Sequence, residues 1–537
     1  MSKRAALTDN EEEEDDYRQL LTRQKKQKTS RVLFRSRTAT PESANLTSPV
    51  NDNKDSISSN SNDNNKIQSN SNFEGNDVDV ASSDESPDTE EQQQQSINEK
   101  QYLETIDRTR LDFDFENLCS VSLSNNNVYA CLTCGKYFQG RGKTSHAYFH
   151  SIDQDHHVYI NLQSLKIYIL PNGYEVDDPS LDDIKYVANP IYTKAQVANL
   201  DKLAESSYDL FHNAYRPGFI GMNNIKENDY ANVVVQALAH TTPLRNFLML
   251  ENLSERPELV KRLSLLVRKI WNRKAFKPHV SPHELLQQVS QMSNKRFSST
   301  VQKDPFDFMN WLLNNTHLAL GGSKTKPFTS IVQFTFQGKV EIQTQKITAR
   351  AVPGDRLKFE ADELIQSKEV PFMFLSLELP PVPLFKGDLE RNAIPQVSLT
   401  SLLKKYDGNQ TQELAGHRKR YKIKKLPNYL VFHIKRFDKT NLDDGKNPTV
   451  VSFDPRGLDM SPYVDNASKP IYYDLVANIV IDVNSTSQGA EKHSWAIQLL
   501  DKATNTWVQI QDLIVKDVRS ELLFLNESYI QVWEKRK

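Results

Sequence analysis

Cysteine is confined to one short stretch of this 537-residue chain, and this stretch strongly limits how its surroundings can fold. The three cysteines, Cys119, Cys131 and Cys134, lie within sixteen residues of one another. A disulfide framework would need more cysteines spread more widely, so the clustering favours a metal in a reducing compartment. Cys131-Leu-Thr-Cys134 lets two thiolates converge on one ion, and Gly135 allows the backbone to fold back. Four histidines follow within 23 residues of Cys134, at His146, His150, His156 and His157. Together they predict a small module stabilised by tetrahedral zinc, rather than two cysteines that merely pack.

The first 98 residues lack the composition of a folded domain. The acidic block Glu11–Asp16 precedes a basic stretch at 23–37 and then a tract rich in serine, asparagine and aspartate. Such a segment buries too little apolar surface to offset the entropy of ordering it, so we predict a disordered tail over 1–98. The basic stretch fits either a nuclear localisation signal or, as we favour, a solvated charged tail.

The overall charge and hydropathy exclude some classes of partner. The formal net charge is −2, so no global field indicates nucleic acid or membrane binding. No run of eighteen apolar residues occurs, and the first residues are basic and then acidic. We therefore expect neither a transmembrane helix nor a secretory signal, and no membrane partner.

Beyond the tail, the pattern of apolar residues predicts an α+β architecture. A cysteine- and histidine-rich module over 99–205 ends in a helical stretch at 193–206. Period-3.6 patterns then predict helices at 230–239, 257–271, 282–292 and 306–318. Period-two patterns predict strands at 328–336, 429–434, 476–483 and 495–500. Helices first and a sheet afterwards are typical of one α+β domain over 206–537.

The segment Gly221–Leu238 resembles the Cys box of ubiquitin-specific proteases, except at the nucleophile. That position holds Asp229, and a carboxylate cannot become the soft thiolate that a histidine activates in a cysteine protease. The resemblance implies a papain-like thumb-palm-fingers domain that has lost its chemistry. On the strand motif around His433 we expect a core or edge histidine rather than a catalytic one. Other stretches resemble the family in the same order, at 304–317, 426–437, 473–478 and 492–496.

The rest of the resembled active site is altered as well. His493 falls on the general-base position and Asn224 on the oxyanion-hole donor, while Gln511 replaces the orienting carboxylate and Asp512 comes one residue late. The resemblance therefore implies a pseudo-deubiquitinase with no catalytic residue. For Asp229 we favour capping of a helix N-terminus, where backbone amides keep the carboxylate ionised and inert, over a new acid–base role.

The cysteine and histidine stretch is similar to the UBP-type zinc finger. The resemblance assigns one metal site to Cys131, Cys134, His150 and His156, which are all present. It assigns a second site to positions that hold Cys119, Ser122, Gln139 and His146. Two ligands of four do not hold structural zinc, so we predict one zinc ion per chain, at the first site. Arg141 matches an arginine with which such fingers grip the C-terminal tail of ubiquitin, but the eroded scaffold favours an ordinary surface arginine.

This combination of finger and Asp-for-Cys domain is similar to the inactive ubiquitin-specific-protease-like splicing factors associated with the tri-snRNP. The most characteristic stretches are 111–115, 134–142 and 228–232. The resemblance implies a nuclear protein of pre-mRNA splicing, which docks spliceosomal proteins in assembling or stabilising the U4/U6.U5 tri-snRNP. The alternatives are a ubiquitin or ubiquitin-like binding adaptor unrelated to splicing, and a residual deubiquitinase. Direct contact with RNA is left open.

Overall fold

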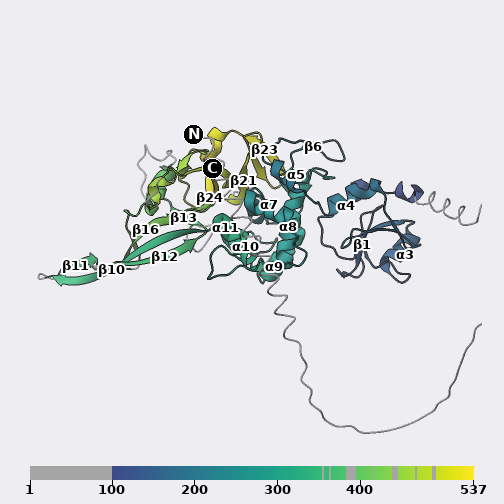
Figure 1. Cartoon of the computed structure of the whole chain (residues 1–537), viewed down its shortest axis with the longest axis horizontal. Helices are drawn as coiled ribbons and strands as arrows, with labels where there is room; N and C mark the ends of the chain where they lie inside the picture. The colour runs from purple at the N-terminus through teal and green to yellow at the C-terminus, as the bar shows by residue number, and fades with distance from the viewer. Residues whose placement is uncertain are drawn as a thin grey trace, which may run out of the picture. The chain divides into compact units, whose positions relative to one another are not determined.

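The computed structural model describes residues 100–352, 356–361, 364–381, 395–414, 416–437, 446–465, 469–485 and 491–537 (Figure 1). The predicted tail over 1–98 lies outside these residues. Short strands around the cysteines come first, then a run of helices, and then two large sheets. Within the described part of the chain, no helix is both long and apolar enough to cross a membrane.

The cysteine-rich module is a five-stranded antiparallel sheet in the order β2–β1–β3–β4–β5. The strands are β1 Val128–Cys131, β2 Tyr137–Gln139, β3 Val158–Asn161, β4 Ile167–Ile169 and β5 Tyr174–Val176. Successive side chains of a strand point to opposite faces, so Ala130 joins one apolar cluster and Cys131 joins another. The second cluster also contains Ala147 of helix α3 (His146–Asp153). Cys131 therefore faces the helix that carries the first histidines.

The turn after β1 depends on glycine, as the sequence predicts. Gly135 has a φ of +74°, and a Cβ there would lie 2.1 Å from the carbonyl oxygen of Arg110. The N–H of Gly135 donates to the carbonyl of Cys131 at 2.9 Å. This turn brings the chain back on itself between Cys131 and Cys134, which allows their two sulfurs to approach each other.

The second region opens with helices, around a fully buried one. Every residue of α6 (Asp229–Ala239) is buried, because its sequence is apolar on nearly all sides. It contacts α10 and strand β21. The remaining helices of eight or more residues here are α7 Thr242–Leu250, α8 Glu258–Ile270, α9 His283–Met292 and α10 Pro305–Ala319.

Two sheets form the rest of this region. The larger has eight strands, with β13–β17–β24–β20–β21–β22–β23 in order and β19 paired to β20. Its strands are β13 Leu375–Glu378, β17 Tyr429–Lys435, β19 Leu458–Asp459, β20 Tyr472–Ser485, β21 Glu491–Asp501, β22 Thr506–Gln511, β23 Ile514–Val518 and β24 Glu527–Lys535. The smaller sheet runs β11–β10–β16–β15, with β12 also paired to β10. Its strands are β10 Gly338–Val352, β11 Arg356–Ala361, β12 Gln366–Phe372, β15 Gln412–Leu414 and β16 His417–Lys425.

Most predicted elements of this α+β region are confirmed, and two are wrong. The stretch 328–336, predicted as a strand, contains the helix α11 (Ile331–Phe336). Ser330 starts this helix by accepting the N–H of Gln333, a capping bond that outweighs the period-two pattern. The helix predicted over 193–206 ends early, since α5 covers only Lys194–Asn199.

The segment that precedes the finger is held by ion pairs near α8. The Asp114 carboxylate is buried and accepts from Lys269 at 3.1 Å, from Lys277 at 2.9 Å and from the backbone N–H of Ser281 at 3.0 Å. Burial alone would raise the pKa of Asp114, but the two lysines lower it. The neighbouring Asp112 pairs with Lys277 at 2.7 Å. The Leu-Asp-Phe-Asp-Phe stretch thus has a structural role as an anchor.

Candidate functional site

The four predicted metal ligands lie together. Their ligand atoms are all within 4.8 Å of one another. Cys134 Sγ lies 3.4 Å from His150 Nε2, and His156 Nδ1 lies 3.2 Å from the same nitrogen. Tetrahedral zinc, with Zn–N of about 2.0–2.1 Å and Zn–S of about 2.3 Å, places neighbouring ligand atoms about 3.3–3.8 Å apart. The set completed by Cys131 therefore has the size and the donor chemistry that zinc requires.

Local structure explains how these residues meet. Ser145 caps α3 by accepting the N–H of Tyr148, which fixes the start of the helix and places His150 one turn further along. The His150 ring stacks on Phe138 of β2, with centroids 4.2 Å apart. A hydrogen bond with the Cys131 thiol lowers the pKa of Cys134 to about 4, so one sulfur of the pair favours the thiolate that a metal needs.

The second, eroded metal position is filled by hydrogen bonds instead. Ser122 Oγ donates to Gln139 Oε1 at 2.8 Å, so the two residues that replace cysteines satisfy each other. The sulfur of buried Cys119 accepts the backbone N–H groups of Val121 and Ser122 at 3.5 and 3.4 Å. In the described part of the chain, no second group of three or more His, Cys, Asp and Glu side chains converges on a metal-sized point.

Arg141 makes contacts inside its own module. Its guanidinium donates to the carbonyl of Gly173 at 2.9 Å and lies 4.2 Å from the centre of the Tyr168 ring. These contacts hold an otherwise exposed side chain against β4, as expected for a surface arginine.

Asp229 is the first residue of α6, and its carboxylate bonds within this helix and to two distant segments. Oδ1 accepts the N–H of Tyr230 at 2.8 Å, while Oδ2 accepts from Gln302 Nε2 at 2.7 Å and from the N–H of Trp495 at 3.1 Å. The prediction of simple helix capping is wrong, because Asn228 occupies the N-cap position. Burial raises the pKa of Asp229 to about 6 although these donors act in the opposite direction. The carboxylate is a cross-link between segments rather than a solvated cap.

His493, Gln511 and Asn224 lie around this carboxylate without forming a triad. The His493 carbonyl accepts from Gln302 Nε2 at 3.0 Å, but its ring Nδ1 is buried and has no hydrogen-bond partner among the described residues. Gln511 Nε2 donates to Ser494 Oγ at 3.0 Å rather than to the histidine. Asn224 Nδ2 donates to Asp512 Oδ2 at 3.0 Å. The side-chain amide that would stabilise an oxyanion is therefore already bonded.

His433 is a core residue of β17, as predicted. Its ring stacks on Phe306 with centroids 3.7 Å apart and meets Tyr529 edge-on at 5.0 Å. Burial lowers the pKa of His433 to about 3, so the ring stays neutral near neutral pH.

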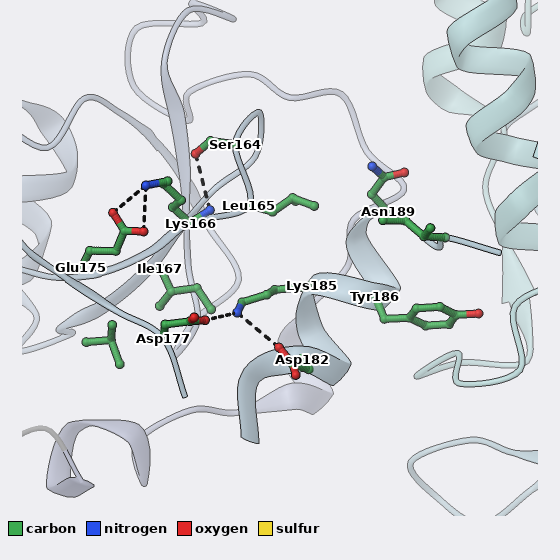
Figure 2. A pocket seen from close by; sticks show the side chains of 12 residues that line it. Ser164, Leu165, Lys166, Ile167, Glu175, Asp177, Asp182, Lys185, Tyr186 and Asn189 are labelled. Atoms are coloured by element: carbon green, nitrogen blue, oxygen red, sulfur yellow. Dashed lines mark hydrogen bonds and ion pairs between the residues drawn. The ribbon is translucent and has the colours of Figure 1, made fainter. Parts of the chain in front are cut away.

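A separate hollow of about 470 Å³ lies beside β4, β5 and α4 (Asp182–Ala188) in the finger module (Figure 2). Its charged side chains pair with one another. Lys166 lies 2.9 Å from Glu175, and Lys185 lies 2.7 Å from Asp177 and 3.2 Å from Asp182. The hollow therefore offers no unpaired charge to a ligand, and none of the predicted site residues lines it.

Two family models match the chain. Residues 220–533 match the ubiquitin carboxyl-terminal hydrolase family, and residues 119–181 match the zinc finger found in ubiquitin hydrolases and other proteins. The chain therefore belongs to the ubiquitin carboxyl-terminal hydrolase family. The predicted fold class, a small UBP-type finger followed by a ubiquitin-specific-protease domain, is confirmed. Both matches lie inside the predicted domains, whose bounds of 99–205 and 206–537 stay predictions.

Individual relatives narrow the resemblance. The chain is 50% identical over 448 residues to "Probable mRNA-splicing protein ubp10" of Schizosaccharomyces pombe, covering 82% of this chain and 89% of that protein. It is 46% identical over 459 residues to "Ubiquitin carboxyl-terminal hydrolase 39" of Mus musculus, covering 81% and 80%. A solved structure described as an essential yeast splicing factor superposes with a TM-score of 0.67 at 33% identity, covering 81% of this chain and all of that one. The predicted resemblance to splicing factors is confirmed.

Proposed function

We propose that this protein is a nuclear pre-mRNA splicing factor that docks other proteins and catalyses no reaction. It would assemble or stabilise the U4/U6.U5 tri-snRNP and the spliceosome. The observation that carries the proposal is Asp229, whose carboxylate cross-links three segments at the position that the family gives to a cysteine nucleophile. Two relatives named for splicing, each matched over about four fifths of this chain, support the same role.

The geometry around Asp229 supports the absence of hydrolase activity in three ways. A carboxylate that accepts three hydrogen bonds is a weak nucleophile held in place by its donors, and without sulfur it cannot form the usual thioester. The His493 ring has no orienting partner among the described residues, since Gln511 is bonded to Ser494. The amide of Asn224 is held by Asp512. The nucleophile position and the oxyanion donor are thus held in structural contacts, and the base has no orienting partner among the described residues.

We further propose that Cys131, Cys134, His150 and His156 hold one structural zinc ion. The spacing of the ligand atoms and the lowered pKa of Cys134 support this assignment. A structural zinc supplies folding free energy to a module that is too small to fold on its apolar core alone. The four ligands would connect β1, α3 and the chain just before β3.

The partners would be spliceosomal proteins of the tri-snRNP. Binding of ubiquitin or a ubiquitin-like protein remains the alternative, but the contacts of Arg141 with Gly173 and Tyr168 do not favour capture of a ubiquitin tail by the finger.

Affinity purification of the tagged full chain from nuclear extract tests the role. We expect tri-snRNP proteins and the U4, U5 and U6 small nuclear RNAs to co-purify with the wild type and equally with Asp229→Asn, which preserves the shape of the side chain. Enrichment of ubiquitin conjugates without spliceosomal components would instead support an adaptor outside splicing. Covalent labelling of the wild type by an activity-based ubiquitin probe would show a residual enzyme.

A further inference from the structure

The smaller sheet concentrates positive charge in a chain that is nearly neutral. Its five strands contain twelve lysines and arginines against four glutamates, a net charge of +8, whereas the whole chain carries −2. Six of the twelve cations lie on the nine-residue strand β16, which reads His-Arg-Lys-Arg-Tyr-Lys-Ile-Lys-Lys. Figure 1 shows β10 as a long strand of this sheet with β11 at its far end, while β12 and β16 pair with its other half.

The two faces of this sheet carry their charges differently. Residues that lie opposite each other on paired strands share a face of the sheet. Glu341 therefore lies on the same face as Lys422, and Glu413 and Arg418 lie on that face too. Acids and bases are joined there, as in the pairs Glu413–Arg418 at 3.3 Å and Glu341–Lys424 at 3.0 Å. On that face, acids therefore offset part of the positive charge.

Over β10, β12, β15 and β16 the opposite face carries cations without acids, and the register also places Glu360 of β11, opposite Thr348, on that face. Ile342, Thr344 and Lys346 alternate along β10 and therefore share a face. Lys368 of β12 lies opposite Ile342, and Lys419 of β16 lies opposite Thr344, so both lysines lie on that face as well. Among the described residues, none of these three lysines has an ion pair or a side-chain hydrogen bond. We call Lys346, Lys368 and Lys419 the basic face.

The neighbours of the basic face indicate what kind of partner fits it. Between the lysines lie Thr344, Gln366 and Gln412, and the apolar residues Ile342 and Tyr421 are half-buried toward the core. Protein interfaces need buried aromatic or aliphatic anchors at their centre. A phosphate backbone needs only cations and hydrogen-bond donors. The surface thus matches a polyanion better than a folded protein.

We propose that the basic face binds the phosphate backbone of single-stranded RNA. Adjacent strands lie about 4.8 Å apart and alternate residues of one strand about 7 Å apart, so the three lysines span several successive phosphates. Contacts of this kind carry no sequence information, so affinity should depend on salt rather than on base sequence. An RNA-binding sheet does not require a role in splicing, so failure of either proposal leaves the other standing.

Fluorescence anisotropy of a labelled oligouridine with the full-length protein tests the contact. The variant Lys346→Glu/Lys368→Glu/Lys419→Glu should bind at least about tenfold more weakly than the wild type. The neutral variant with glutamine at the same three positions should lower the slope of log affinity against log salt by about 2, since each phosphate contact contributes about 0.7 on single strands.

A matched control separates position from overall charge. Lys143, Lys324 and Lys516 are exposed, lie outside the smaller sheet and pair with no acid among the described residues. Changing these three to glutamate alters the net charge by the same amount, and we expect nearly wild-type binding. Circular dichroism of all variants checks that they fold. Equal weakening by the control, or no binding of RNA by the wild type, would overturn the proposal.

Crosslinking locates the contact and excludes the tail as its source. With 4-thiouridine RNA, we expect crosslinked peptides from β10, β12 and β16. Crosslinks confined to residues 1–98 would place RNA binding in the basic stretch of the tail and refute a role for the sheet. Binding of polyglutamate, but not of RNA, through the three lysines would show that an acidic protein is the partner instead.

Discussion

The finger and the protease-like domain each contain a polar cluster that resembles a family site, and the two clusters have opposite fates. Around Cys131 and His150 the ligand atoms converge within 4.8 Å of one another. The Asp229 carboxylate is already paired, with Gln302 and the Trp495 N–H on the same oxygen. The first cluster is arranged for an ion, and the second is arranged to satisfy itself.

The difference shows how the loss of a site can be recognised. Residue identity alone does not show whether a site has been lost, since His493 and Asn224 fall on the positions that the family resemblance assigns to the base and the oxyanion donor. The hydrogen bonds of these residues show the loss. The Asn224 amide is held by Asp512, and the His493 ring lacks an orienting partner among the described residues. The eroded metal position behaves like the second cluster, with Ser122 bonded to Gln139. A buried polar group that has found a protein partner no longer awaits a ligand.

The largest expected effect is loss of the metal from the convergent cluster. Structural zinc in small fingers contributes about 10–16 kcal/mol, so Cys134→Ser should unfold the finger from about residue 102 to 190. Native mass spectrometry should find one zinc per wild-type chain and none in the variant. Hydrogen exchange should show lost protection in β1 to β5 while α6 and the eight-stranded sheet stay protected.

Cys119→Ser is the matched control for this prediction. Cys119 is buried whereas Cys134 is half-buried, and Cys119 lies at the eroded position, where its sulfur accepts two backbone N–H groups. The variant should keep one zinc and a folded finger. Two zinc ions per wild-type chain, or loss of zinc in Cys119→Ser, would contradict the assignment of a single zinc site.

The next largest effect concerns restoring a nucleophile to the cluster around Asp229. Asp229→Cys supplies a nucleophile, but Asn224 stays bonded to Asp512 and Gln511 stays bonded to Ser494. A positioned general base contributes about 10²–10⁴-fold, and that factor is lost when the base is not oriented. We therefore expect no efficient turnover of a fluorogenic ubiquitin substrate, with binding to splicing partners retained. Robust turnover by this single variant would show that only one residue, and not the whole site, has changed.

Much of this contrast is visible in the sequence. The Cys131–Cys134 spacing and the following histidines are local signals that predict zinc, and the resemblance to the UBP-type zinc finger assigned His150 and His156 as the other two ligands. The replacement at Asp229 and the altered Gln511 were visible through family motifs. The core role of His433 followed from its place in an apolar strand, and its stacking on Phe306 bears this out.

What the sequence hid is the set of long-range partners. No motif marks Gln302, which bonds to Asp229 across 73 positions, or Asp512, which reaches Asn224 across 288. The helix amides near Asp229 could be read from the sequence, and they led us to expect a carboxylate that stays ionised. Its distant surroundings could not be read, and burial among them raises its pKa instead. The basic strand β16 was readable as a run of charge, yet only the register separates its paired face from its unpaired one.

A smaller effect follows from the raised pKa of Asp229. The pKa is about 6 in the folded protein and 3.8 ordinarily, so between these values the folded state holds a proton that the unfolded state has released. The stability due to this group is therefore complete below about pH 4 and is lost as pH rises through 6. Asp229→Asn does not titrate, so the free energy of unfolding of the wild type minus that of the variant should fall by about 2.4 kcal/mol from pH 4 to 7. Urea unfolding at several pH values measures this difference. Because the Asp512 charge helps to raise the pKa of Asp229, the same comparison made in an Asp512→Asn background removes the titration of Asp512. A difference that does not change with pH would contradict the buried, cross-linked carboxylate.

The smallest effect is expected at the eroded metal position. Gln139→Ala removes one neutral hydrogen bond from Ser122 at a half-exposed site, which costs about 1 kcal/mol or less of the free energy of unfolding of the finger. The zinc ratio should stay at one, since Gln139 would hold no metal. The opposite change, Ser122→Cys with Gln139→Cys, restores two thiolates beside Cys119 and should raise the ratio toward two if the position still has the geometry of a site. A loss of zinc in Gln139→Ala would mean that the two positions depend on each other, and the contrast between a convergent and a self-satisfied cluster would then fail within the finger itself.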